Sequence, residues 1–424
     1  MASSVFALVD CNNFYASCEK LFRPDLKHLP VVVLSNNDGC VVARSKEAKA
    51  LGIKMGVPVF QIKELIRQHG IVCFSSNYAL YADISHRVMT TLEILAPRTE
   101  IYSIDEAFLD LTGVDRCICL ETFAQQVRQQ VYQWTGIRVC VGIAPTKTLA
   151  KLANHAAKAY PATQGVVDLT NPIRQRKLMA LLPVSEVWGI GRKLTQRLEL
   201  LGIKTALELA DAPPKWIKQN FSIVVERTVR ELNGQACLDL EPEAPTKQQI
   251  ICSRSFGQRI TEFTAMREAI SLYATRGAEK LRQQKRAAKM LTVFIRTNPH
   301  SQHEPFYSES ASIDLIEPSD DTRRLIEVAH AGLKAIWKDG YRYMKGGIVL
   351  SDFYAPGTWQ RSLFDDAPEK PKSKKLMTAL DQIHKKGLGR VFFAAQGTQP
   401  GWSMKREMLS PAYTTRWSDL PKAR

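Results

Sequence analysis

The 424-residue chain is long enough for two to four domains, and a hydrophobic content of 45% is sufficient to fill their cores. Its net charge of +16 favours a polyanionic partner, because Lys and Arg that neutralise phosphates release condensed counterions. No apolar run approaches the roughly 20 residues of a spanning helix, and nine scattered cysteines without a Cys-x-x-Cys pair favour reduced thiols over a zinc site. We therefore expect a soluble, cytoplasmic protein that binds nucleic acid and no membrane.

The N-terminal region predicts short strands and helices in alternation. The apolar run Val5–Val9 predicts a buried strand that ends at Asp10. Pro30–Leu34 and Cys40–Ala43 predict a hairpin, because the string between them is rich in Ser, Asn, Asp and Gly. The stretch Ser45–Leu51 follows as a predicted helix, which a glycine ends.

Further along, a second pair of acidic residues lies in a strand-like stretch. Glu100–Leu111 is rich in β-branched and aromatic residues and contains the adjacent acids Asp105 and Glu106. Arg138–Ile143 predicts another strand, and Thr146–Lys158 predicts a basic helix. Strands mixed with helices predict an α+β layer as the chemical core.

The sequence pattern changes from Leu181 onwards. Helical periodicity follows a Gly-x-Gly turn there and predicts a small helical domain. The Pro-rich, charged stretch Glu241–Lys247 predicts a linker. A second α/β module is then predicted as strand, helix, strand, helix and strand at Ile250–Ser255, Ala265–Gln284, Met290–Arg296, Asp321–Lys338 and Gly347–Phe353. The remainder carries a lysine run, Lys370–Lys375, and little periodicity, so its first part is predicted to be a linker.

The acids at two strand ends are the first indication of chemistry. Converging carboxylates supply the hard oxygen ligands that Mg²⁺ requires, and two such ions can promote phosphoryl transfer. An isolated Asp at a strand terminus is more often simply solvated. Neighbouring residues on a regular strand also point to opposite faces, so Asp105 and Glu106 can serve one site only if the chain turns there.

Three longer strings make a family resemblance. They are Asp10–Glu19 (DCNNFYASCE), Tyr102–Leu111 (YSIDEAFLDL) and Gly142–Asn154 (GIAPTKTLAKLAN). In order and spacing they resemble the central motifs of Y-family DNA polymerases, the low-fidelity lesion-bypass class, and the chain looks closest to the UmuC-type polymerases of bacteria. The resemblance covers about the first 350 residues. It implies error-prone, template-directed DNA synthesis past damaged bases, part of SOS mutagenesis, without proofreading.

The same resemblance implies an α+β multidomain, right-hand fold. Its parts would be the palm at residues 1–20 and 78–166, the fingers at 21–77, a helical thumb with a helix-hairpin-helix at 167–240, a linker at 241–249, an α/β little finger at 250–354, and a C-terminal tail at 355–424.

Carried over by motif, the catalytic metal ligands would be Asp10, Asp105 and Glu106, with the backbone carbonyl of Cys11 as a further ligand. The implied cofactor is a pair of Mg²⁺ ions, for which Mn²⁺ could substitute. Tyr15 would lie beneath the deoxyribose as a steric gate against a 2′-hydroxyl, although an aromatic at such a place is ordinarily part of a core.

The resemblance also implies contacts with the substrates, dNTPs and primer-template DNA. Phe14 lies beside the gate, and Lys46, Lys49 and Lys158 would contact the triphosphate. Many relatives have Tyr and Arg where this chain has Lys46 and Lys49, so a point charge replaces a bidentate fork. The duplex backbone would be gripped by a helix-hairpin-helix turn and by the little finger, through Gly189, Gly191, Arg192, Lys193 and Arg254.

Protein partners are expected at the tail. Gln360, Leu363 and Phe364 resemble the short peptide that bacterial polymerases insert into the sliding clamp, and adjacent exposed apolar residues need a partner. The residues after them would bind a processed UmuD-like dimer, and a RecA filament would activate the complex on the nucleoid. These partners rest on family analogy.

Two other functions are compatible with parts of the sequence. A two-metal nuclease would use the same carboxylates with water as nucleophile, but it has no need for Tyr15 or for triphosphate-binding lysines. A DNA-binding scaffold built on the helix-hairpin-helix would tolerate loss of the carboxylates.

Overall fold

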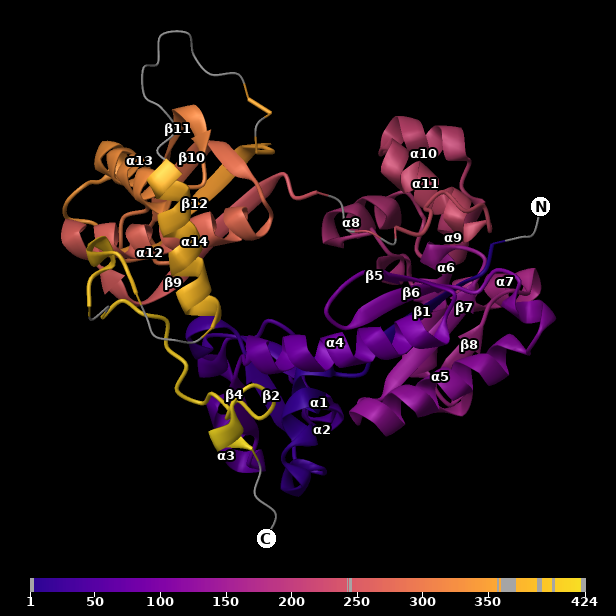
Figure 1. Cartoon of the computed structure of the whole chain (residues 1–424). Coiled ribbons are helices and arrows are strands. Elements are labelled where there is room, and N and C mark those ends of the chain that lie inside the picture. Colours follow the sequence, from indigo (N-terminus) through magenta and orange to yellow (C-terminus); the bar gives the residue numbers. More distant parts are fainter. Residues whose placement is uncertain are drawn as a thin grey trace. The chain divides into compact units, whose positions relative to one another are not determined.

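The computed structural model describes residues 4–241, 243, 246–356, 358–359, 371–386, 391–398 and 401–420. The chain divides into two compact units. The first comprises residues 1–35, 39–244 and 408–424, and the second comprises residues 36–38 and 245–407. Figure 1 labels most of the helices and strands of both units. Among the described residues, every helix is too short or too polar to cross a bilayer.

A five-stranded sheet is the centre of the first unit. Its strands, in spatial order, are β5 (Arg98–Ile101), β6 (Glu106–Asp110), β1 (Phe6–Cys11), β7 (Val139–Ala144) and β8 (Val166–Asp168). Every residue of β1 is buried because helices cover both faces of the sheet. One face packs against α4 (Tyr78–Leu95) and α5 (Leu120–Thr135), and the other packs against α6 (Lys147–Ala159).

The alternation of side chains along β1 assigns each residue to one of two cores. Ala7 and Val9 belong to the core that contains α4 and α5, whereas Phe6 and Leu8 belong to the core that contains α6. Asp10 continues the second series, so its position on the strand directs it toward the α6 face.

The strand-like stretch Glu100–Leu111 contains parts of two strands with a turn between them. It contributes to the antiparallel hairpin of β5 and β6, which pair from Arg98 opposite Asp110 to Ile101 opposite Ala107. Both halves have strand-like composition, and the turn between them contains no glycine or proline that would mark it in the sequence. The turn places the adjacent acids at a strand end.

A smaller sheet in this unit confirms the predicted hairpin. Its order is β3 (Val41–Arg44), β2 (Val31–Leu34) and β4 (Val72–Ser75), with β2 antiparallel to β3 and parallel to β4. The helices α1 (Phe14–Leu21), α2 (Lys46–Ala50) and α3 (Lys63–His69) accompany it. The side chain of Ser45 accepts a hydrogen bond from the Ala48 amide and so caps the predicted helix α2.

The predicted helical region is a cluster of five helices that completes the core on the α6 side. They are α7 (Pro172–Leu181), α8 (Arg192–Leu200), α9 (Ala206–Asp211), α10 (Pro214–Asn220) and α11 (Ile223–Leu232).

The second unit contains a four-stranded antiparallel sheet with α12 (Phe263–Gln283) and α13 (Thr322–Ile336) packed in its core. The spatial order is β11 (Ser308–Ser319), β10 (Ala287–Arg296), β12 (Tyr343–Tyr354) and β9 (Gln249–Ile260). The five predicted elements are confirmed, but β11 was missed. Its Ser, Glu and Asp residues read as a loop, and they are tolerated because β11 is an edge strand.

The first part of the tail is not only a linker. Pro371–Lys385 forms the helix α14, whose Met377 is buried and whose Asp381 accepts two hydrogen bonds from Arg282, at 2.7 and 2.8 Å. Of the lysine run, the described residues Lys374 and Lys375 lie in the first turns of this helix. The predicted division into palm, fingers, thumb and little finger remains a prediction.

Gly142 is where α6 approaches β7 most closely. A Cβ added there would lie 2.2 Å from the Asn154 amide nitrogen and 2.4 Å from the Ala150 carbonyl oxygen, both backbone atoms. Because neither the sheet nor the helix can give way locally, we expect Gly142→Ala to destabilise the fold by about 3 kcal/mol. Urea unfolding measures this loss. The matched Gly401→Ala change, which meets no atom within 4 Å, should leave stability within about 0.5 kcal/mol, and equal loss in both variants would contradict the packing argument.

Candidate active site

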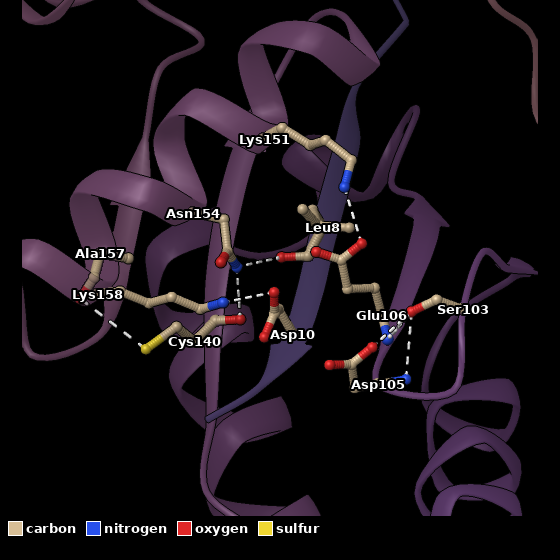
Figure 2. A network of polar contacts seen from close by, with 10 residues as sticks. All are labelled: Leu8, Asp10, Ser103, Asp105, Glu106, Cys140, Lys151, Asn154, Ala157 and Lys158. Carbon is tan, nitrogen blue, oxygen red and sulfur yellow. Dashed lines mark hydrogen bonds and ion pairs between the residues drawn. The ribbon is translucent and has the colours of Figure 1, made fainter. Parts of the chain in front are cut away.

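Two of the predicted metal ligands face each other across neighbouring strands. Asp10 on β1 is directly opposite Glu106 on β6 in the antiparallel register, and Leu8 is opposite Phe108. Phe108 and Leu8 both belong to the core on the α6 side. The two carboxylates therefore lie on the α6 face of the sheet, at the end of both strands (Figure 2).

The third acid, Asp105, is held in the turn before β6. The hydroxyl of Ser103 donates to Asp105 Oδ1 at 2.7 Å and accepts from the amides of Asp105 and Glu106 at 3.2 and 3.1 Å. The amide of Cys11 donates to the Asp105 carbonyl oxygen at 2.8 Å, which ties this turn to the end of β1. The chain thus turns at the point where neighbouring acids would otherwise point to opposite faces.

Two lysines of α6 pair with the two facing carboxylates. Lys158 forms an ion pair with Asp10, and Lys151 pairs with Glu106 at 2.8 Å. The lysines are seven residues apart, two turns of the helix, and therefore lie on one face of α6. Asn154, between them, fastens the helix to the sheet by donating to the Leu8 and Cys140 carbonyl oxygens at 3.1 and 2.8 Å (Figure 2).

The environment shifts the pKa values of Asp10 and Glu106 in opposite directions. Burial raises the pKa of Asp10 to about 7. The charge of Lys158 opposes this shift, and the neighbouring Glu106 carboxylate adds to it. Burial also acts on Glu106, but its contacts with Asp10 and Lys151 outweigh it and lower the pKa of Glu106 below its usual value. The pair therefore carries less negative charge near neutral pH than two exposed carboxylates would.

The donor set fits a hard divalent cation. Asp10, Asp105 and Glu106 offer carboxylate oxygens near one strand end. The Cys11 side chain is buried in the core on the opposite face of the sheet, so the backbone carbonyl of that residue is the atom that could be a ligand. In the described part of the chain, no three acidic, His or Cys side chains are gathered tightly enough to enclose a metal ion. The ammonium groups of Lys158 and Lys151 supply the positive charge beside the carboxylates.

The two aromatic residues predicted to lie beside the nucleotide, Phe14 and Tyr15, are the first residues of helix α1. Phe14 is buried in the core, whereas Tyr15 is only partly buried against it. The Tyr15 ring stacks on that of Tyr81, with centroids 4.4 Å apart and planes at 15°, and it meets Tyr78 edge-on at 6.1 Å. Tyr15 thus has one ring face held by an aromatic neighbour while part of its surface remains exposed.

The lysines of α2 differ in their surroundings. Both are exposed, and Lys46 lies in the first turn of the helix. Lys49 lies in the last turn, where desolvation and then the charges of Arg44 and Lys158 lower its pKa, while Asp10 opposes the shift. The effects of Asp10 and Lys158 on this pKa indicate that Lys49 is near the carboxylates.

The predicted phosphate-binding turn precedes α8. Gly189 has a φ of +88°, which favours glycine, and Gly191 is the N-cap residue of the helix. Arg192 and Lys193 are exposed in the first helical turn. Free amide groups and two cations therefore occupy one helix end, as a phosphate contact requires.

In the second unit, Arg254 is exposed on the edge strand β9. Burial and the charges of Arg296 and Arg254 lower the pKa of Lys345, so three cations lie close together on this sheet. The predicted clamp peptide, with Gln360, Leu363 and Phe364, lies outside the described residues.

Lys151 is the site residue that the sequence reasoning missed. Besides its contact with Glu106, its ammonium group lies 4.5 Å from the ring centre of Tyr102 and 5.3 Å from that of Trp188. The spacing from Lys158 on a predicted helix was a usable signal, but it becomes meaningful only once β1 and β6 are known to be neighbours.

Four family models match successive parts of the chain. A model of the impB/mucB/samB family matches residues 9–155, a model of the C-terminal domain of that family matches residues 247–363, and a model of its HHH motif matches residues 174–203. A domain of unknown function matches residues 374–423.

Individual relatives extend over almost the whole chain. Protein ImpB of Salmonella typhimurium is 54% identical over 99% of this chain and 100% of its own length. Protein UmuC of S. typhimurium strain LT2 is 55% identical over 98% of this chain and 99% of its own length. A solved Y-family DNA polymerase chimera, 21% identical, covers 83% of this chain and 99% of its own with a TM-score of 0.67, which confirms the predicted fold class. The chain belongs to the impB/mucB/samB family and is a UmuC-like member of the Y-family DNA polymerases.

Proposed function

We propose that the chain copies damaged DNA by adding dNTPs to a primer 3′-hydroxyl, with two metal ions and without proofreading. The observation that carries the proposal is the facing of Asp10 and Glu106 at one strand end, with Asp105 in the adjoining turn and two lysines of α6 alongside. Polymerisation needs both a carboxylate cluster and nearby cations for the triphosphate. A nuclease needs only the first of these.

Asp10, Asp105, Glu106 and the Cys11 carbonyl would hold two Mg²⁺ ions, which Mn²⁺ could replace. When bound, such ions polarise the primer hydroxyl and neutralise charge on the leaving oxygen. The burial of Asp10 and the hydrogen bond from Ser103 to the Asp105 carboxylate support a fixed position for these two side chains.

The chain's own cations would bind the triphosphate. Lys158 is the best placed, because it already contacts Asp10. Lys49 is the second candidate, because the charges of Asp10 and Lys158 both affect its pKa. Lys46 would contribute from the first turn of α2. Tyr15 would lie against the sugar of the incoming nucleotide, with Phe14 fixing the start of its helix.

The primer-template duplex would be held through its phosphates. The turn of Gly189 and Gly191 would bind one phosphate by its free amides, with Arg192 and Lys193 adding charge. Arg254 would contribute from the second unit. These contacts would be independent of base sequence, which suits an enzyme that must accept damaged templates.

Partners of the tail also belong to the proposal. Gln360, Leu363 and Phe364 would dock on the sliding clamp, and a processed UmuD-like dimer and a RecA filament would support synthesis on the nucleoid during the SOS response. The likeness to Protein UmuC supports this assignment.

Primer extension on undamaged and abasic templates, with Mg²⁺ and all four dNTPs, tests the proposal. We expect extension across the lesion by the wild-type chain and none by an Asp105→Ala/Glu106→Ala variant. Shortening of the primer instead would identify a nuclease. DNA binding without synthesis, even with clamp, UmuD-like protein and activated RecA present, would contradict the polymerase function and favour the DNA-binding scaffold.

A further inference from the structure

The segment Met408–Leu420, within the region matched by a domain of unknown function, is part of the first unit. Its start pairs with the edge strand β4. The Ser75 amide donates to the Met408 carbonyl at 2.9 Å, the Met408 amide donates to Ser75 Oγ at 3.1 Å, and Ser75 and Leu409 form a parallel bridge. The segment thus covers an edge that would otherwise present unpaired backbone groups.

Asn77 joins this segment to helix α4. Its Oδ1 accepts a hydrogen bond from the Leu80 amide and caps the helix, while its Nδ2 donates to Ser410 Oγ at 3.0 Å and to the Ser410 and Pro411 carbonyls at 3.3 Å. One side chain therefore fixes both the helix start and the position of Ser410.

Ser410 in turn reaches a buried carboxylate. Its hydroxyl donates to Glu19 Oε1 at 3.1 Å, and the Tyr81 hydroxyl donates to the same oxygen at 2.6 Å. Glu19 and Tyr81 are both 0% exposed. Burial raises the pKa of Glu19, and these two hydrogen bonds oppose the shift. A buried carboxylate that depends on hydroxyl donors is sensitive to the loss of either one.

Tyr81 carries the connection to Tyr15. Its hydroxyl is fixed by Glu19, and its ring stacks on the Tyr15 ring at 4.4 Å. The orientation of one ring is thereby set at both ends, by a hydrogen bond from its hydroxyl and by stacking on its face.

We propose that the C-terminal segment around Ser410 positions Tyr15 through Glu19 and Tyr81, and so tunes how strongly the polymerase rejects ribonucleotides. The inference rests on the proposed role of Tyr15 as steric gate. It gives a residue 391 positions from Glu19 in sequence a role in substrate selection, although Ser410 itself contacts neither substrate nor metal ligand. Ser410 is a positioning residue.

The test compares single-nucleotide incorporation of a dNTP and the matching rNTP, as kcat/KM, by the full chain under conditions in which the wild type extends primers. We expect Ser410→Ala and Tyr81→Phe each to lower the preference for dNTP by about 3- to 10-fold. Because both changes act on Glu19, the double variant should fall short of the product of the two single effects. Ser418→Ala, an exposed position of the same segment, should match the wild type.

Tyr15→Ala separates failure of this inference from failure of the gate. If Tyr15→Ala admits ribonucleotides and the Ser410 and Tyr81 variants keep wild-type discrimination, the connection is wrong. If Tyr15→Ala also discriminates normally, the gate assignment itself is wrong. Lower thermal stability of Ser410→Ala with an unchanged dNTP preference would reduce the segment to a packing element and overturn the proposal.

Discussion

Replacing Asp10 by Asn should abolish nucleotide incorporation without weakening the fold. Loss of one oxygen ligand removes several kcal/mol of charge stabilisation, a fall in kcat of about 1,000-fold or more. Yet burial raises the pKa of Asp10 to about 7, so above that pH the folded state carries a charge that it disfavours. A neutral amide of the same size removes this cost. The ion pair with Lys158 is lost as well, but the pKa of Asp10 is raised in spite of that pair, and the Lys158 side chain is partly exposed and stays hydrated.

Glu106→Gln should be equally inactive but less stable. The folded state favours the charged form of Glu106, as its lowered pKa indicates, and the variant loses the ion pair with Lys151. We would measure thermal unfolding at pH 8 with EDTA, and single-turnover incorporation with Mg²⁺. Asp110→Asn, on the same strand and paired with exposed Arg98, is the control and should remain active. Full activity of Asp10→Asn would remove the metal-site assignment, and equal loss of stability in both variants would contradict the assigned acidities.

Tyr15→Ala should admit ribonucleotides. If the ring closes the space beside the 2′ carbon, forcing a hydroxyl into it costs about 1–3 kcal/mol, as overpacking does elsewhere, so discrimination should fall about 10- to 100-fold. Ratios of kcat/KM for dNTP and rNTP measure the change. The ring, rather than its hydroxyl, is the proposed barrier.

Tyr15→Phe is therefore the matched control. It keeps the ring and its stacking on Tyr81, and we expect it to discriminate as the wild type does. Equal relaxation in both variants would point to the hydroxyl instead, and no change in either would return Tyr15 to an ordinary packing role.

Local pattern was enough to predict most elements and the family motifs. The run Val5–Val9 and the capped helix after Ser45 depend on neighbours in sequence, and both formed where predicted. The pairing of Asp10 with Glu106 depends on β1 lying beside β6, about a hundred residues later, and no local pattern contains that information. The family motif supplied it, since it implied a shared metal site.

Contacts that the motifs do not contain could not be predicted. Lys151 belongs to a motif string, but its role appears only when the order of strands is known. Ser410 lies in a polar stretch without periodicity, and its contacts with Asn77 and Glu19 are made by side chains of distant segments. Such tertiary contacts leave no trace in hydrophobic spacing.

The pairing of Ser75 with Leu409 also fixes an order of events during synthesis. Strand β4 and the buried Glu19 leave the ribosome more than three hundred residues before the segment that completes them. During that interval Glu19 lacks one of its two hydroxyl donors, and an edge of the sheet is open to other chains. A polypeptide cut short before Met408 would keep every carboxylate and lysine of the candidate active site, yet it would lack the Ser410 hydroxyl that donates to Glu19 beside Tyr81.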